Sequence, residues 1–307
     1  MFKLPSQIPT LEDSVEVLTD YLEFECIKDG RISLLGKINK LLFQNDEVLV
    51  QGIEDETDQA LAKTEEISQE IERRAMISEA YPFKLERGGY RLDVVNNTSE
   101  YWVYVYLLLS TRLNMNAHKK HSDIDGTELL EYLSAEVVKN YFGVHSQSMV
   151  FGTAVQGGFK EKINDLCTQI GEGAGYKGRG KITGSPKDDK LDVVVWVDFK
   201  DKYWSKLIGF GQCKTGTTFD DQATIELQPR AFCEKWLIDT PVIEPIKMFF
   251  CSQNYPIVDY SKVKNAGLVF DRMRIMDCLT VDTLPDSLHK KITMWCTEAL
   301  AFIQDAQ

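Results

Sequence analysis

Two short apolar runs near the middle of the chain constrain its fold most, LDVVVWVDF at 191–199 and KLIGFGQCK at 206–214. Branched and aromatic residues in runs of this length favour buried strands. The intervening KDKYWS is typical of a turn, so the two strands are expected to pair. Paired in this way, they bring Asp192, Gln212 and Lys214 together at one edge of a sheet.

Helical and strand patterns alternate around these two runs, which predicts an α/β fold with a mixed central sheet flanked by helices. Two helices are expected before the pair of strands. After it we expect a helix, two further strands and a terminal helix. The predicted ranges are helices at 127–142, 159–170, 222–238 and 285–303, and strands at 246–253 and 268–279.

The first 120 residues have a different pattern and are expected to form a mainly helical N-terminal module, followed by a second domain at 121–307. Apolar residues at helical spacing predict helices at 10–24, 31–43 and 56–79, the first with a capping box at Thr10 and Asp13. Gly88 and Gly89 lie between two short alternating runs, which indicates a hairpin at 81–95. The module is interpreted as a sensor, a partner-docking element or an oligomerisation element.

The charge of the chain is acidic overall but basic around the two strands. With 47 acidic and 35 basic residues the net charge is −12, which excludes a protein that coats nucleic acid with its whole surface. Segment 176–214 has nine basic and five acidic residues, a net charge of +4. Either the loop at its start is simply solvated, or it contacts a phosphate backbone through Lys177, Arg179, Lys181, Lys187 and Lys190.

Cysteine usage and the N-terminus predict a soluble cytoplasmic protein that does not enter a membrane. The seven cysteines are dispersed without a CxxC pair, which is typical of reduced thiols. The N-terminus lacks a secretory signal pattern. The longest apolar run, WVYVYLLL at 102–109, is too short for a bilayer span.

The residues at the strand edge have the chemistry of a magnesium site. A carboxylate and an amide oxygen are ligands that Mg²⁺ accepts, and Mn²⁺ is a possible substitute. A lysine beside such a cation can orient a water molecule and offset the charge of an attacked phosphate. Asp192, Gln212 and Lys214 therefore predict hydrolysis of phosphodiester bonds. The alternative is an ordinary surface aspartate and a polar strand end.

In this order of elements the chain from about 127 to 253 resembles the core of the restriction-endonuclease-like superfamily, the PD-(D/E)xK nucleases. The closest resemblance is to Mrr-type members, in which glutamine replaces the second acidic residue. The matching motifs are LDVVVW with Asp192 and GFGQCKTG with Gln212 and Lys214. The family core runs helix, strand, strand, strand, helix, strand. The long connector before Asp192 and the first 120 residues depart from that pattern.

The resemblance implies specific roles. Asp192 and Gln212 would bind the metal and Lys214 would act on the water or the phosphate. The first core helix of the family often carries an auxiliary glutamate, which would be Glu131 here, with Glu128 as the second choice. The implied protein is a Mg²⁺-dependent DNA endonuclease, the effector of a prokaryotic restriction or phage-defence system.

Two other classes of function stay open from the sequence. One is a catalytically inactive nuclease-fold protein that binds nucleic acid or a partner protein. The other is an RNA-directed nuclease. The chain has no GxxxxGK[ST] motif, so we expect any ATP-driven step to come from a partner ATPase, and self-association is the alternative way to strengthen weak DNA binding.

Overall fold

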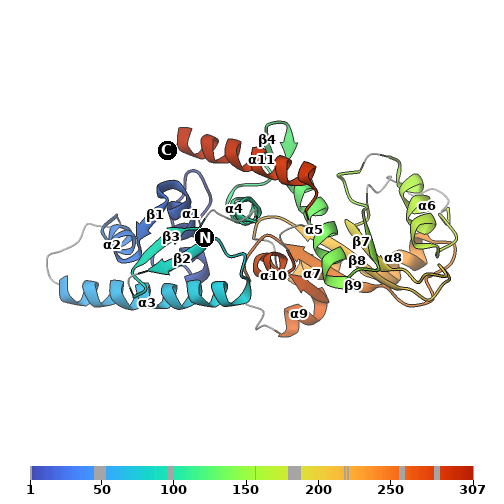
Figure 1. Cartoon of the computed structure of the whole chain (residues 1–307), viewed down its shortest axis with the longest axis horizontal. Coiled ribbons are helices and arrows are strands. Elements are labelled where there is room, and N and C mark those ends of the chain that lie inside the picture. The colour runs from blue at the N-terminus through green and yellow to red at the C-terminus, as the bar shows by residue number, and fades with distance from the viewer. Residues whose placement is uncertain are drawn as a thin grey trace.

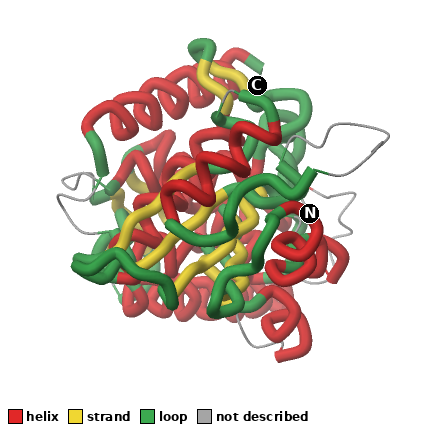
Figure 2. The backbone as a smooth tube through the Cα atoms, turned by 90° about the vertical axis from the view of Figure 1, so that its right-hand side faces the viewer, coloured by secondary structure: helices red, strands yellow, loops and turns green. Residues whose placement is uncertain are grey.

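The computed structural model describes residues 2–44, 53–86, 88–95, 100–155, 157–178, 188–217, 219, 221–255, 260–279 and 284–306. The molecule is elongated, with a five-stranded mixed sheet towards one end and a three-stranded sheet towards the other (Figure 1). In the turned view of Figure 2, strands occupy the middle of the molecule and helices lie around them. The predicted class, a mixed α/β protein with a central sheet flanked by helices, is confirmed.

The five-stranded sheet has the order β10-β9-β8-β7-β6. The pairs β6–β7 and β7–β8 are antiparallel, whereas β8–β9 and β9–β10 are parallel. A parallel neighbour requires a crossover, and helices make both of them: α7 and α8 before β9, and α9 before β10. The bounds are β6 Ser146–Val150, β7 Val193–Val197, β8 Leu207–Lys214, β9 Ile246–Cys251, β10 Leu268–Phe270, α7 Asp221–Glu226, α8 Pro229–Trp236 and α9 Tyr260–Ala266.

Strand β7 is apolar along its length because both of its faces are covered. Val193 and Val195 belong to the same hydrophobic cluster as the buried side chains of α5 (Gly126–Phe142). Val194 and Trp196 point to the other face, where they pack with residues of α6 (Phe159–Ile170) and α8. The predicted strand therefore forms inside the sheet, between β6 and β8, and the polar residue before it, Asp192, lies where the strands end.

The N-terminal region combines four helices with a small antiparallel sheet of order β1-β3-β2. The predicted hairpin is confirmed as β2 and β3, and Gly88 and Gly89 both have left-handed φ values of 67° and 92°. The bounds are α1 Val15–Asp29, β1 Arg31–Ser33, α2 Leu34–Gln44, α3 Ile53–Ile77, β2 Phe83–Glu86, β3 Arg91–Val94 and α4 Tyr101–Arg112; a short ribbon follows, β4 Lys120–His121 and β5 Ile124–Asp125.

Helix α4 lies between the two sheets and contains the apolar run at 102–109 (Figure 1). Its side chains are buried because α10 (Arg272–Asp277) and α11 (Asp286–Asp305) pack on it, with Tyr106 edge-to-face on Trp295. One hydrophobic cluster accordingly includes residues from Phe2 to Ile303. The boundary at residue 120 stays a prediction. Within the described helices, none combines the length and apolarity that a membrane span would need.

Several local predictions were wrong. The predicted strand 268–279 ends after three residues, because Asp271 accepts a hydrogen bond from the Arg274 backbone and caps α10. The predicted helix 222–238 is two helices, since Pro229 lacks an N–H and begins α8. The predicted helix 31–43 starts as β1, and the first helix begins at Val15 rather than at the Thr10 box. Strand β6 was not predicted at all.

Candidate active site

Asp192 is held by the backbone of both neighbouring strands. Its N–H donates to the carbonyl of Gly211 at 2.9 Å, and its own carbonyl accepts from the N–H groups of Phe151 and Gly152 at 2.7 and 3.0 Å. Its Oδ2 accepts from the backbone N–H of Cys213 at 2.7 Å. The carboxylate is thus locked at the point where β6 ends, β7 begins and β8 runs past.

Glu131 approaches the same point from α5. Its Oε1 accepts from the Thr153 hydroxyl at 3.0 Å and its Oε2 accepts from the backbone N–H of Ala154 at 3.1 Å. The side chain is buried, with Glu131 only 5% exposed. Glu128, one turn earlier, is not among the residues that line the cavity described below. The structure therefore brings Glu131, and not the second choice, to the sheet edge.

The two carboxylates meet beside Gly152. A Cβ atom added to Gly152 would collide with Glu131 Oε2 and would lie 2.9 Å from Asp192 Oδ1, so glycine is what allows both groups to approach this loop. The buried ammonium of Lys162 donates to the carbonyls of Phe151 and Gly152 at 3.2 and 2.6 Å. Lys162 therefore pins the loop against the two acids.

The electrostatic environment opposes ionisation of both acids. Burial raises the pKa of Asp192 well above its usual range, and the neighbouring charge of Glu131 raises it further. Burial also raises the pKa of Glu131, although the hydrogen bonds from Ala154 and Thr153 act in the other direction. In the described part of the chain neither carboxylate is paired with a lysine or arginine. A cation at this position would favour the ionised form of both.

The β8 residues of the predicted motif meet a third acid, Glu226, the last residue of α7. Glu226 Oε2 accepts from Gln212 Nε2 at 2.6 Å and is 2.8 Å from Lys214 Nζ. Gln212 is buried, and among the described residues its Oε1 has no hydrogen-bond partner. Continuing the β7–β8 register by one residue places Asp192 directly opposite Gln212, where side chains of an antiparallel pair lie on one face.

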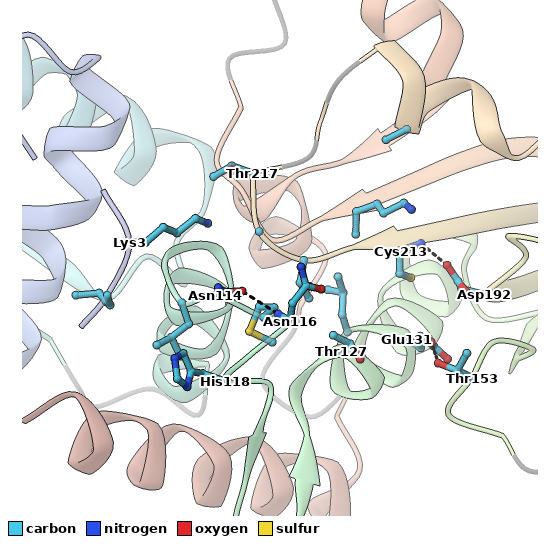
Figure 3. A pocket seen from close by; sticks show the side chains of 18 of the residues that line it. Lys3, Asn114, Asn116, His118, Thr127, Glu131, Thr153, Asp192, Cys213 and Thr217 are labelled. Atoms are coloured by element: carbon cyan, nitrogen blue, oxygen red, sulfur yellow. Dashed lines mark hydrogen bonds between the residues drawn. The ribbon is translucent and has the colours of Figure 1, made fainter. Parts of the chain in front are cut away.

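Glu131, Asp192, Lys214 and Glu226 line one cavity of about 990 Å³. Its opposite wall comes from the N-terminal region, from the segment Lys3–Gln7 and the loop 113–118 (Figure 3). Gln212 lies behind the cavity lining, next to Glu226. Neither this wall nor Glu226, Lys162 and Gly152 was predicted from the sequence. No local pattern marks these residues, because each acts through contacts with a different secondary-structure element or loop.

The residues present fit a divalent cation with oxygen ligands. Among the described residues, no three His, Cys, Asp or Glu side chains are grouped to hold a metal. The candidate set instead has two carboxylates and an amide oxygen, Gln212 Oε1, which is buried without a hydrogen-bond partner in the described ranges. Uncompensated carboxylates and an orphaned carbonyl oxygen are the donors that Mg²⁺ or Mn²⁺ takes, whereas a site for soft metals would need thiolates or imidazoles.

The predicted phosphate-contacting loop is described only at its two ends. Lys177 donates to the Glu234 carbonyl at 3.2 Å, and Lys190 Nζ lies 3.5 Å from Glu226 Oε1. The three other basic residues proposed for this role, Arg179, Lys181 and Lys187, lie outside the described residues. Of the two predicted basic contacts that the structure describes, Lys190 is the one that an ion pair connects to the candidate site.

Comparison of the chain with protein-family models, with curated proteins and with solved structures found no match in any of the three.

Proposed function

We propose that this protein is a metal-dependent nuclease that hydrolyses phosphodiester bonds in DNA. The observation that carries the proposal is the pair Glu131 and Asp192, buried at a sheet edge without a basic partner among the described residues and sharing one cavity with Lys214. A buried acidic pair is costly unless something compensates its charge. A divalent cation would do so, and a phosphate would be the natural substrate beside it.

The arrangement of elements supports the proposal. Helix α5 is followed by β6, then by α6, then by β7 and β8, then by α7 and α8, and then by β9. Apart from α6, which is inserted between β6 and β7, this order is similar to the helix, strand, strand, strand, helix, strand order of the PD-(D/E)xK nucleases, and it includes β6, a strand that was not predicted from the sequence. The motif residues Asp192, Gln212 and Lys214 lie at the matching strand ends.

In this proposal Asp192, Glu131 and the Oε1 atom of Gln212 would hold Mg²⁺. When bound, the cation would offset the charge of the attacked phosphate and make a water molecule more acidic. Lys214, whose ammonium is partly exposed at the cavity, would donate hydrogen bonds to the water or to a phosphate oxygen. Lys162 keeps the Gly152 loop in place, so that both carboxylates stay oriented without rearrangement.

The test is nicking of supercoiled plasmid with Mg²⁺, with Mn²⁺ and with EDTA. Asp192→Ala and Lys214→Ala should each reduce the nicking rate by about 100-fold or more, as loss of one electrostatic group at an active site does. Asp201→Ala and Lys200→Ala are matched controls, since both side chains are exposed in the β7–β8 turn at the other end of the strands. They should retain the wild-type rate.

Parallel incubation with RNA distinguishes the substrate. If the protein cleaves RNA and does not cleave DNA, its substrate is RNA. A wild-type protein that cuts neither polymer, or a rate that survives both alanine substitutions, would contradict the proposed function and favour a binding protein with the same fold.

A further inference from the structure

We propose that Glu226 is a positioning residue of the site, which holds the amide of Gln212 with its carbonyl oxygen free for a cation and fixes the ammonium of Lys214. This inference rests on the proposed function. It adds a residue that lies outside the D…QxK motif and comes from the helix after β8. The three side chains meet at a single carboxylate oxygen, Oε2 of Glu226.

The contacts of Glu226 determine which end of the Gln212 amide faces it. An ionised carboxylate only accepts hydrogen bonds, so the NH₂ group of the amide must point to Glu226, as it does at 2.6 Å. The carbonyl oxygen then points away from Glu226, and it is buried with no hydrogen-bond partner in the described part of the chain. A buried acceptor without a partner is unfavourable, and a cation bound to Oε1 would remove that cost.

Glu226 also explains why an amide fits at position 212. With a glutamate there, two carboxylates would lie within hydrogen-bond distance of each other, which is unfavourable when both are ionised. With Gln212, the charge of Glu226 is instead balanced by Lys214 at 2.8 Å and Lys190 at 3.5 Å. Gln212 and Glu226 therefore act as a matched pair, in which the acid orients the amide.

The experiment measures Mn²⁺ affinity by titration calorimetry and plasmid nicking on the full chain. Glu226→Ala should weaken Mn²⁺ binding and slow nicking by roughly 10- to 100-fold, as the loss of a residue that orients a metal ligand does. The matched control is Glu234→Ala, an exposed glutamate of α8 that pairs with Arg230 away from the cavity. It should change neither value.

A rescue separates positioning from simple structural support. Glu226→Gln keeps the side-chain volume but no longer forces the amide orientation, so it should also weaken Mn²⁺ binding. The double substitution Gln212→Glu with Glu226→Gln exchanges acid and amide and re-forms their hydrogen bond, so it should restore Mn²⁺ affinity to within a few-fold of the wild type. A residue that only stabilised α7 would show no such rescue.

The failures are distinguishable. If the wild type binds Mn²⁺ and nicks plasmid, and Glu226→Ala and Glu226→Gln do both equally well, the role of Glu226 is overturned. The proposed nuclease function would be unaffected by that result. A wild-type protein with neither activity would overturn both. If Glu226→Ala loses its cooperative thermal transition, Glu226→Gln and the double variant decide the outcome.

Discussion

The acidic pair of helix α1 and the acidic pair at the sheet edge differ in what balances their charge. Asp20 and Glu23, the α1 pair, are buried and hydrogen-bonded to basic side chains and to two tyrosines. Although burial opposes it, the surrounding guanidinium groups hold the pKa of Asp20 well below its usual range. Their partners are Arg74, Arg112, Arg272, Tyr81 and Tyr104.

Glu131 and Asp192, the sheet-edge pair, are held by backbone N–H groups and one hydroxyl, and burial raises the pKa values of both. Burial raises the pKa of Glu23 as well, but Arg74 and the hydroxyls of Tyr81 and Tyr104 contact its carboxylate. The α1 pair therefore has its basic partners within the chain, whereas no lysine or arginine of the described residues forms an ion pair with the sheet-edge acids. Both pairs are buried, so burial alone does not identify a functional acid. What identifies it is a rigid set of acceptors without a cation from the described chain.

Removing charge from the α1 pair should have the largest effect on stability. Asp20→Asn keeps the shape but leaves buried guanidinium groups without their acid, and breaking a buried ion pair in this way costs about 3–5 kcal/mol. Urea denaturation measures the loss in the free energy of unfolding. Asp29→Asn, at the partly exposed end of the same helix, should cost less than about 1 kcal/mol. A similar small loss in Asp20→Asn would show that the network contributes little.

Crowding the sheet-edge pair should have the next largest effect on the free energy of unfolding. Gly152→Ala places a methyl group against Glu131 and Asp192, and we expect a loss of about 1–3 kcal/mol from overpacking. Because the carboxylates must move apart, Mn²⁺ affinity measured by calorimetry should also fall. If stability and affinity both stayed at wild-type values, the loop would not hold the acids as described.

Neutralising an acid of the sheet-edge pair should change the free energy of unfolding in the opposite direction from neutralising an acid of the α1 pair. Asp192→Asn removes a repulsive buried charge, so the metal-free protein at pH 7 should become more stable. Mn²⁺ at 100 times its Kd should stabilise the wild type by about 2.7 kcal/mol and should leave the variant unchanged. Thermal unfolding with Mn²⁺ or EDTA measures both. If Asp192→Asn destabilises the protein in EDTA, the charge of Asp192 is not repulsive in the metal-free fold, and the two acidic pairs do not differ as described.

The pH dependence of stability should be the smallest effect, and its sign differs between Asp192 and Asp20. The folded pKa of Asp192 is raised, so in metal-free protein its ionisation destabilises the fold as pH rises above the unfolded value of about 3.9. The folded pKa of Asp20 is lowered, so its contribution is present above that value and is lost on acidification. Unfolding curves from pH 4 to pH 8 should show the gain from Asp192→Asn growing with pH. A gain that shrinks would contradict the assigned shift.

The sheet and most of its motif residues could be predicted because their signals are local. Two apolar runs with polar ends determined β7 and β8, and the residues at those ends are the ones that lie near the sheet edge. Helix α6 forms over its predicted range, 159–170, because its periodicity and glycine C-cap agree. Strand β6 was missed because SQSMV is polar and only its pairing with β7 makes it a strand.

The sequence alone determined the α/β class and a set of candidate residues, since hydrophobic periodicity and polar strand ends depend on neighbours in the chain. Only the tertiary structure decided which acids are compensated. The arginines that complete Asp20 lie up to 252 residues away, and Glu226 reaches Gln212 through a helix after the motif. Charge balance in a buried site depends on distances of a few ångströms between segments, and the order of residues does not contain those distances.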